Sequence, residues 1–242
     1  MSRKWWRKWF RFIVVIVTTL QALSQSRGLQ TRHQRAQWLH EWCSTLLRRL
    51  HIHIEFTGTP PATGLVISNH LGYIDILVFS AIAPFIFVSK SEVKDWPLFG
   101  QMAIRSGTVF VVRSRKSDVS RVKDEIVEAL HDDTAVMLFP EGTSSDGSSV
   151  LPFLPSLLEA AVAAKATIHT AHVRYSSSDG DVVQDVHWWG DMEFMPNLFR
   201  LLALDDVHAD ILFSEDTYRI SDRKQAAIDL HQRMLQLHGR DK

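Results

Sequence analysis

The sequence predicts an α/β fold, in which a mixed, largely parallel sheet is covered by helices and preceded by two N-terminal helices. Three observations support this prediction. Short apolar runs typical of buried strands recur through residues 51–242, stretches with helical periodicity separate them, and residues 1–50 differ from the rest in charge. With 242 residues, 45% of them hydrophobic, the chain can bury a sizeable core. We therefore predict a helical segment, residues 1–50, followed by one domain, residues 51–242.

The composition excludes several classes of protein. The chain is too apolar to be disordered and lacks the glycine repeat of collagen. The single cysteine, Cys43, cannot form an internal disulfide, which favours folding in a reducing compartment. Although the formal net charge is +0, residues 1–50 hold ten basic residues against one acidic residue, leaving 17 basic and 26 acidic residues in 51–242. Such a basic segment predicts an anionic partner, either a lipid surface or a nucleic acid.

The first helix is expected to lie at a membrane surface. Its cations alternate with four aromatic residues, Trp5, Trp6, Trp9 and Phe10. An apolar run follows from 12 to 20, which is short because a spanning helix needs about 20 apolar residues. Indole rings beside cations suit the headgroup layer. The pattern favours an interfacial helix over a spanning helix or a cleaved signal peptide, and whether residues 9–23 lie in the membrane or cross it stays open. A nucleic-acid partner is not expected, because the apolar run has no role on a duplex.

A second helix is predicted over residues 31–50. Five residues fall on one stripe at helical spacing: Leu39, Trp42, Cys43, Leu46 and Leu50. This stripe is typical either of a helix packed on the core or of one in contact with lipid, and the cysteine on it is expected to be buried. The two helices together form the predicted membrane-docking segment.

Residues 51–242 are predicted to form the sheet. Residues 51–56 alternate apolar and polar positions, as a half-buried strand does. Four further runs are apolar throughout and predict buried strands: Leu65–Ser68, Phe85–Ser89, Thr108–Val112 and Ala135–Phe139. Additional strands are expected at 167–175, 181–188 and 207–213.

Three helices are predicted between and after these strands. The clearest covers 118–131, after a candidate N-cap at Ser117, and another covers 154–165. The last covers about 222–239 with Ser221 as its cap. Four of its apolar residues are expected to face inward: Ala227, Leu230, Met234 and Leu237. The alternation of strands and helices with short connections predicts the α/β class.

Polar residues follow the strand at 65–68. His70 comes directly after this strand and its neighbour Asn69, and Asp75 lies five positions further on. If a helix opens at Gly72, the carboxylate of Asp75 can reach the imidazole and fix its tautomer, leaving the other ring nitrogen free as a general base. The alternative interpretation is an ordinary strand-to-helix turn, with a solvated histidine and an acid at the helix start.

A second polar loop follows the strand at 135–139. Residues 139–145 read FPEGTSS and bring a carboxylate, a glycine and several hydroxyls together. Active sites of α/β folds lie just after the C-terminal ends of strands, so this loop and the His70 loop are both candidates. Taken alone, the second loop is equally typical of a flexible surface turn.

Together these segments resemble the glycerophospholipid acyltransferases of the 1-acylglycerol-3-phosphate acyltransferase type. The first family motif, NHxxxxD, is matched by Asn69, His70 and Asp75. The second, Gly-x-x-Phe-x-x-Arg, is matched by Gly107, Phe110 and Arg113, and the third, FPEGTS, by residues 139–144. A lesser Lys-x-Glu feature is matched at Lys90 and Glu92.

Within that family, the stretch 139–153 looks closest to bacterial members, including those that act on lyso-ornithine lipid. Two features depart from the family pattern. Ala171 stands where the fourth motif normally has a proline, and no basic residue follows soon after Phe153.

The resemblance implies transfer of a fatty acyl group from acyl-CoA or acyl-carrier protein to the sn-2 hydroxyl of 1-acylglycerol-3-phosphate (lysophosphatidate), which gives phosphatidate in phospholipid biosynthesis. It implies that His70 is the general base and that Asp75 orients it. The substrate-binding residues implied are Asn69, Lys90, Arg113, Glu141, Gly142 and Thr143. Among these, Arg113 would grip the phosphate, Glu141 and Thr143 would contact glycerol hydroxyls, and backbone N–H groups around Gly142 would hold the developing oxyanion.

We expect no cofactor and no metal ion. The pairs His51/His53 and His169/His172 are unaccompanied by thiols and are better explained as structural or surface histidines. The lipids of an anionic leaflet are the expected partner, because a monoacyl lipid keeps its tail in the bilayer. The expected location is the cytoplasmic face of the inner membrane, with peripheral attachment or a single N-terminal helix.

Three alternatives stay open. The first is a lyso-ornithine lipid O-acyltransferase or another lysolipid acyltransferase with the same chemistry. The second is an acyl-thioester hydrolase, in which water replaces the alcohol. The third is an inactive membrane-binding scaffold, against which the joint presence of His70, Asp75, Arg113 and Glu141 counts.

Overall fold

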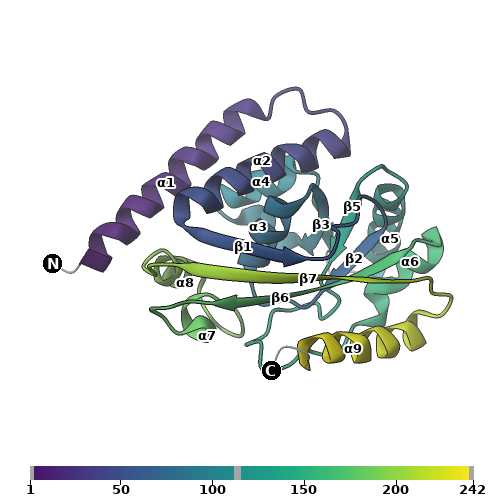
Figure 1. Ribbon diagram of the computed structural model, residues 1–242. Helices are drawn as coiled ribbons and strands as arrows, with labels where there is room; N and C mark the ends of the chain where they lie inside the picture. Colours follow the sequence, from purple (N-terminus) through teal and green to yellow (C-terminus); the bar gives the residue numbers. More distant parts are fainter. Residues whose placement is uncertain (1–2, 112–115, 240–242) are drawn as a thin grey trace.

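The computed structural model describes residues 3–111 and 116–239. Over these residues the chain forms one twisted sheet with helices on both faces (Figure 1). The seven strands stand in the order β1-β7-β6-β2-β5-β3-β4, and every neighbouring pair is parallel except β6 with β7. The predicted mixed, largely parallel sheet is therefore confirmed.

The strands lie close to where the apolar runs predicted them. They are β1 (Ile52–Thr57), β2 (Leu65–Ser68), β3 (Phe85–Lys90), β4 (Val109–Val111), β5 (Ala135–Leu138), β6 (Ile168–Ser176) and β7 (Val207–Tyr218). The central strands β2 and β5 are buried at every position, which is why they are continuous apolar runs. Their central position brings the loops that follow them to the same edge of the sheet.

Helices divide between the two faces of the sheet. One face is covered by α1 (Arg3–Gln25), α2 (Arg32–Leu50), α3 (Tyr73–Ile82), α4 (Phe99–Arg105) and α8 (Phe194–Leu201). The opposite face is covered by α5 (Lys116–Leu130), α6 (Glu159–Ala164) and α9 (Arg223–Gly239). Figure 1 shows α1 and α2 on one side of the sheet and α9 on the other. Three short helices complete the described part of the chain: η1 (Ser91–Asp95), η2 (Pro155–Leu158) and α7 (Val182–Asp185).

Helix α2 is a core helix. Its start is fixed by a reciprocal cap, in which the Thr31 side chain accepts from the Gln34 N–H and the Gln34 side chain accepts from the Thr31 N–H. The residues of the predicted stripe are all buried against the sheet and α3: Leu39, Trp42, Cys43, Leu46 and Leu50. Of the two interpretations of this stripe, packing on the core is the one that the structure shows.

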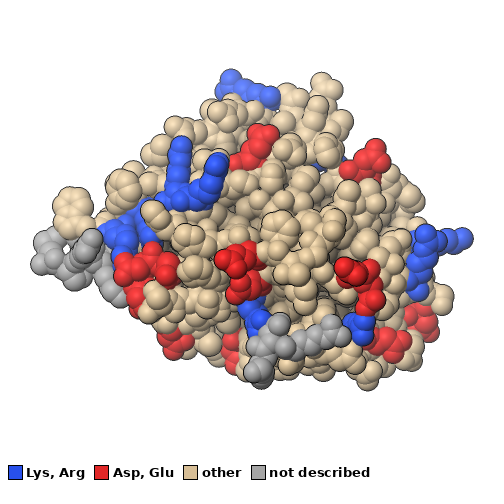
Figure 2. All heavy atoms as spheres, viewed as in Figure 1, with Lys and Arg blue, Asp and Glu red and all other residues tan. Residues whose placement is uncertain are grey.

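Helix α1 is fastened to the rest of the protein through arginines. Arg11 is buried, and its guanidinium donates to the carbonyls of Leu204 and Asp205 in the turn that follows α8. Arg7 donates to the Ala203 carbonyl and forms an ion pair with Asp205. These two cations therefore contact the protein and not an outside surface. Figure 2 agrees, since basic side chains adjoin acidic ones near the start of α1 and charged groups are scattered elsewhere on this face.

The outward face of α1 is apolar. Large hydrophobic side chains are exposed along it at helical spacing, and we call them the α1 stripe: Trp6, Trp9, Phe10, Ile13, Val17 and Leu20. Phe10 is 64% exposed and Ile13 is 58% exposed, whereas Val15 on the opposite face is buried. Among the described residues, no helix has the length and apolar character required to cross a bilayer.

Several local predictions were wrong. Residues 181–188 do not form a strand, because the Asp181 side chain accepts from the Val183 and Gln184 N–H groups and starts the short helix α7. Helix α8 was not predicted. Helix α9 is capped by Asp222, whose carboxylate accepts from the N–H groups of Lys224 and Gln225, and not by Ser221.

Two other helices differ from their predicted bounds. Helix α5 begins at Lys116, so Ser117 lies inside it and is not its N-cap. The predicted helix at 154–165 is divided into η2 and α6, with Pro155 at the start of the 3-10 turn. The four inward residues predicted for α9 are all buried, which confirms the period of that helix.

Candidate active site

The two polar loops identified in the sequence meet at one edge of the sheet. The His70 loop follows β2 and the loop at 139–145 follows β5, and these strands are parallel neighbours. The Ser145 N–H donates to the His70 carbonyl at 2.9 Å. The Phe139 ring is stacked on the imidazole of His70, with 4.2 Å between centroids and 13° between planes. The structure therefore joins the two loops into one site.

His70 and Asp75 form a hydrogen-bonded pair. Nδ1 of His70 lies 2.7 Å from Oδ2 of Asp75, and because the carboxylate accepts, Nδ1 carries the proton. Nε2 is then the basic nitrogen of the neutral ring. The His70 side chain is 20% exposed, whereas Asp75 is completely buried. This is the arrangement that a carboxylate-oriented general base requires.

Asp75 also caps α3. Its Oδ2 accepts from the backbone N–H groups of Leu71 and Gly72, at 2.7 Å and 3.0 Å, in the first turn of the helix. The positive end of a helix stabilises a carboxylate at this position. Asp75 is thus both an acid at the helix start and the hydrogen-bond partner of the histidine, and the catalytic role of the pair stays a prediction.

The second carboxylate oxygen of Asp75 has a partner that sequence reasoning missed. The Tyr175 hydroxyl, from the C-terminal end of β6, donates to Oδ1 of Asp75 at 2.7 Å. Burial, reinforced by the charge of Asp75, raises the pKa of Tyr175 well above its usual value, so the phenol stays protonated. Tyr175 falls at the end of the predicted strand at 167–175. Its place at the end of this predicted strand was the only signal for Tyr175 in the sequence.

The Glu141 carboxylate accepts hydrogen bonds from two backbone N–H groups. Its Oε1 accepts from the His70 N–H and its Oε2 from the Leu151 N–H, both at 2.8 Å, and the side chain is 4% exposed. In this structure both oxygens accept protein N–H groups, and the contact of Glu141 with a glycerol hydroxyl stays a prediction. Burial raises the pKa of Glu141 to about 7, against the opposing effect of these two hydrogen bonds.

Asn69 is likewise a structural residue. Its side-chain amide donates to the Val173 carbonyl at 3.0 Å and its Oδ1 accepts from the Val173 N–H at 2.9 Å. This exchange extends the pairing of β2 with β6 beyond the last paired residues. Asn69 is buried and connects the His70 loop to β6, and its contact with substrate stays a prediction.

Gly142 has a positive φ of 71°, which glycine adopts without strain, and its N–H donates to the Phe139 carbonyl at 3.0 Å. That N–H is engaged in the turn, and the oxyanion site around Gly142 stays a prediction. Thr143, one residue further, is exposed at the tip of the loop. Lys90 is exposed at the end of β3, and Arg113 lies outside the described residues.

A loop that precedes α8 covers the His70 turn. The Trp188 N–H donates to the Leu71 carbonyl at 2.8 Å, and a Cβ on Gly72 would come within 2.9 Å of the Trp188 nitrogen. Glycine is required at position 72 by this close approach. The same loop carries His187, whose Nδ1 donates to the Asp146 carbonyl at 2.8 Å, and burial lowers the pKa of His187.

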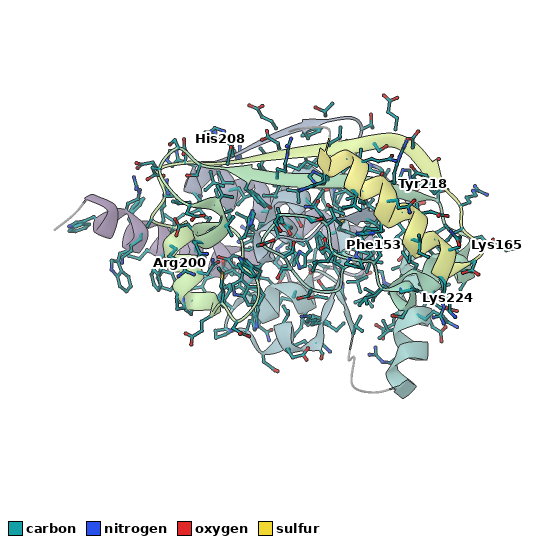
Figure 3. The ribbon with its side chains drawn as sticks, turned by 90° about the horizontal axis from the view of Figure 1, so that it is seen from below. Phe153, Lys165, Arg200, His208, Tyr218 and Lys224 are labelled. Atoms are coloured by element: carbon teal, nitrogen blue, oxygen red, sulfur yellow. The ribbon has the colours of Figure 1, made fainter. Side chains whose placement is uncertain are left out.

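Helix α9 supports the other side of the site. Figure 3 shows α9 on the outer face of the sheet with Phe153 close to it. The Phe153 and His231 rings meet edge to face at 5.4 Å, and Nε2 of His231 donates to the Val150 carbonyl at 2.9 Å. Because the Leu151 N–H binds Glu141, α9 supports the carboxylate that holds His70.

An apolar cavity of about 90 Å³ lies between the helices on the α1 side of the sheet. Its lining residues come from α2, α3, α4 and α8 and include Trp42, Leu46, Ile76, Phe99, Met102 and Leu198. Ile76 is the residue next to Asp75, so the cavity borders the helix on which the dyad is built. An elongated apolar group is the kind of ligand that suits such a lining.

Comparison with known proteins agrees with this geometry. The family model described as Acyltransferase matches residues 37–174, so the chain belongs to the acyltransferase family and is an O-acyltransferase. The lyso-ornithine lipid O-acyltransferase of Brucella abortus is 35% identical over 184 residues, which cover 70% of this chain and 69% of that protein. The 1-acyl-sn-glycerol-3-phosphate acyltransferase of Neisseria gonorrhoeae is 30% identical over 172 residues, covering 68% and 67%.

A solved structure shares the fold. The 1-acyl-sn-glycerophosphate acyltransferase PlsC of Thermotoga maritima superposes with a TM-score of 0.69 at 14% identity, covering 97% of this chain and 95% of that one. The likeness includes the N-terminal helices, since it extends over nearly the whole chain.

Proposed function

We propose that the protein transfers a fatty acyl group from a thioester to the hydroxyl of a lysolipid, with His70 as the general base. The observation that carries this proposal is the buried carboxylate of Asp75 on Nδ1 of a partly exposed imidazole. Nε2 would take the proton from the acceptor hydroxyl while its oxygen attacks the thioester carbonyl carbon. The carbon–sulfur bond then breaks, the proton passes from Nε2 to the leaving thiolate, and an ester and a free thiol result.

Backbone N–H groups would hold the negative charge on the carbonyl oxygen. The Gly142 N–H is already bonded to Phe139, but the N–H groups of Thr143 and Ser144 have no acceptor among the described residues. We assign the oxyanion site to these two groups. A donor of this kind typically contributes about 3 kcal/mol to stabilising the transition state.

Lysophosphatidate is the acceptor that the motifs favour, and acylation of its sn-2 hydroxyl would give phosphatidate. In this proposal Arg113 binds the phosphate, for which a bidentate guanidinium is suited, and Lys90 assists it. Thr143 lies exposed beside the oxyanion site and would contact the glycerol part.

A second acceptor, lyso-ornithine lipid, is favoured by a specific observation. Proteins named lyso-ornithine lipid O-acyltransferase from Brucella abortus and Rhizobium meliloti are 35% and 34% identical to this chain, against 30% for the Neisseria gonorrhoeae enzyme. The chemistry at His70 would be the same, and only the headgroup contacts would differ.

The acyl donor is proposed to be acyl-CoA or acyl-carrier protein, without any further cofactor. We propose that the apolar cavity between α2, α3, α4 and α8 receives part of an acyl chain. The lining is almost entirely carbon, so an acyl chain loses little on leaving the bilayer for it.

The proposed location is the cytoplasmic face of the inner membrane. The α1 stripe would insert among the lipids of one leaflet, because it exposes large apolar and aromatic side chains along the outward face of the helix. Since Arg7 and Arg11 are used within the protein, the attachment would depend on the apolar stripe more than on charge.

One assay tests the function. The purified protein is incubated with acyl-CoA or acyl-carrier protein as donor, crossed with lysophosphatidate or lyso-ornithine lipid as acceptor. Formation of the diacyl lipid with one acceptor identifies it. Release of free fatty acid at the same rate with and without acceptor would instead show a thioester hydrolase and contradict the proposal.

A further inference from the structure

Tyr175 is the sole described partner of Oδ1 of Asp75. The two oxygens of this carboxylate are unequally occupied, since Oδ2 accepts three hydrogen bonds, from Nδ1 of His70 and from the N–H groups of Leu71 and Gly72. Oδ1 accepts the Tyr175 hydroxyl at 2.7 Å, and no other donor to it occurs in the described part of the chain. A buried carboxylate with one empty oxygen would be costly, so this hydroxyl completes the site.

The hydroxyl comes from a rigid part of the fold. Tyr175 lies on β6, between the backbones of β2 and β7, and the ring is 8% exposed. The His187 ring packs edge to face on it, with 6.0 Å between centroids. The donor therefore reaches Asp75 from the sheet, whereas the two backbone N–H groups come from the turn that precedes α3.

We propose that Tyr175 is a positioning residue of the acyl-transfer reaction, which orients the Asp75 carboxylate and tunes how strongly His70 binds a proton. This inference rests on the proposed role of His70 as general base. A donor on Oδ1 draws negative charge away from Oδ2, which weakens the pull of the carboxylate on the imidazolium. Without the hydroxyl, the carboxylate would hold the imidazolium more tightly and His70 would become more basic.

Other titratable groups surround the dyad. Glu141 faces the His70 backbone from the loop after β5, and His187 and Asp146 lie beyond the Tyr175 ring. None of these three is bonded to a carboxylate oxygen of Asp75 among the described residues. Because the pKa of Glu141 is raised to about 7 and the charge of Asp75 acts on both Glu141 and His187, the Tyr175 variants are also compared in a Glu141→Gln background.

The test is the pH profile of kcat/KM for Tyr175→Phe, measured with the acceptor that the purified protein uses. The acid limb of this profile reports the pKa of the general base in the free enzyme. We expect the limb to move to higher pH by roughly half a unit or more, with kcat reduced roughly tenfold and KM little changed. Tyr218→Phe is the matched control, because it removes a tyrosine hydroxyl that has no hydrogen-bond partner in the described part of the chain and lies opposite Ile168, at the other end of β6 from Tyr175. Its acid limb should coincide with that of the unmodified protein.

A second variant guards against loss of folding. Incorporation of 3-fluorotyrosine at position 175 strengthens the donor while keeping the hydroxyl, and should move the acid limb to lower pH. An acid limb that stays in place in both variants would overturn the role of Tyr175. The role of His70 is tested separately, because an active His70→Ala protein would remove the general base and with it the basis of this inference.

Discussion

Glu141 and His70 are 71 residues apart in the chain, yet Oε1 of Glu141 accepts the His70 N–H at 2.8 Å. The other oxygen of the same carboxylate accepts the Leu151 N–H at the same distance. One buried acid thus connects the loop that carries the imidazole with both ends of the loop after β5. The acid of the FPEGTS motif therefore has a bridging role within the protein.

The raised pKa of Glu141 makes stability depend on pH. Its pKa is about 7 in the folded protein and 4.5 in the reference state, so between these values the folded chain binds a proton that the unfolded chain has lost. The contribution is therefore complete below pH 4.5 and is lost as pH rises through 7, with an upper limit of about 3 kcal/mol in the free energy of unfolding. Urea denaturation at several pH values measures this. The slope should be absent in Glu141→Gln, and an identical slope in that variant would assign it to another group.

His70→Ala should abolish acyl transfer. Removal of the base leaves the acceptor hydroxyl protonated at the moment of attack, and we expect a loss of at least about a hundredfold in rate. Circular dichroism should show an unchanged fold. His131→Ala, at an exposed turn after α5, is the control and should keep full activity. A His70→Ala protein that keeps more than about a hundredth of the rate would exclude His70 as base.

Arg113→Ala should chiefly weaken binding of lysophosphatidate. This expectation comes from the resemblance of the sequence, because residue 113 lies outside the described ranges. A phosphate that loses a bidentate partner should show a KM raised roughly tenfold or more, with a smaller change in kcat. Lys123→Ala on α5 is the control for loss of a nearby surface cation. An unchanged KM would place the phosphate elsewhere.

Recovery in the membrane fraction should depend on the α1 stripe. Phe10→Asp combined with Ile13→Asp places two charges on its exposed face and should shift the protein to the soluble fraction, since a charge is costly to insert among lipids. Ile228→Asp, which alters an exposed apolar residue on α9, should leave the distribution unchanged. Equal recovery of all three proteins with membranes would show that α1 does not anchor the chain.

Arg11→Ala should destabilise the protein. It leaves the carbonyls of Leu204 and Asp205 without their donor in a buried turn, at an expected cost of about 2 kcal/mol in the free energy of unfolding. Arg48→Ala is the control, because Arg48 is exposed and bonds within its own helix. Equal stability of the two variants in urea would mean that the Arg11 hydrogen bonds do not contribute to holding α1.

The strands and the dyad could be predicted because their signals are local. Three apolar residues and a buried serine form β2, and the spacing of His70 and Asp75 is set by a single turn of helix. The roles of Asn69 and Glu141 could not be predicted in this way. Each bonds to backbone groups more than sixty residues away or across a loop, and a motif match does not distinguish a polar residue that binds a ligand from one that binds the chain.

The errors at 181–188 and in α8 have a similar cause. The alternating pattern of 181–188 resembles a strand, but Asp181 provides a helix cap and the chain turns instead. Arg7 and Arg11 were predicted as lipid-facing cations on the basis of their neighbours, whereas their carbonyl partners lie beyond residue 200. Contacts between segments far apart in the chain therefore determine where these two arginine side chains lie.

The segment that covers the His70 turn is attached to it through the backbone. Trp188, whose N–H binds the Leu71 carbonyl, lies beyond residue 174, where the match to the family model ends. The backbone contact at Gly72 needs no particular side chain at position 188. A substitution at position 188 therefore changes the side chain above the His70 turn while the backbone hydrogen bond that holds this segment in place is kept.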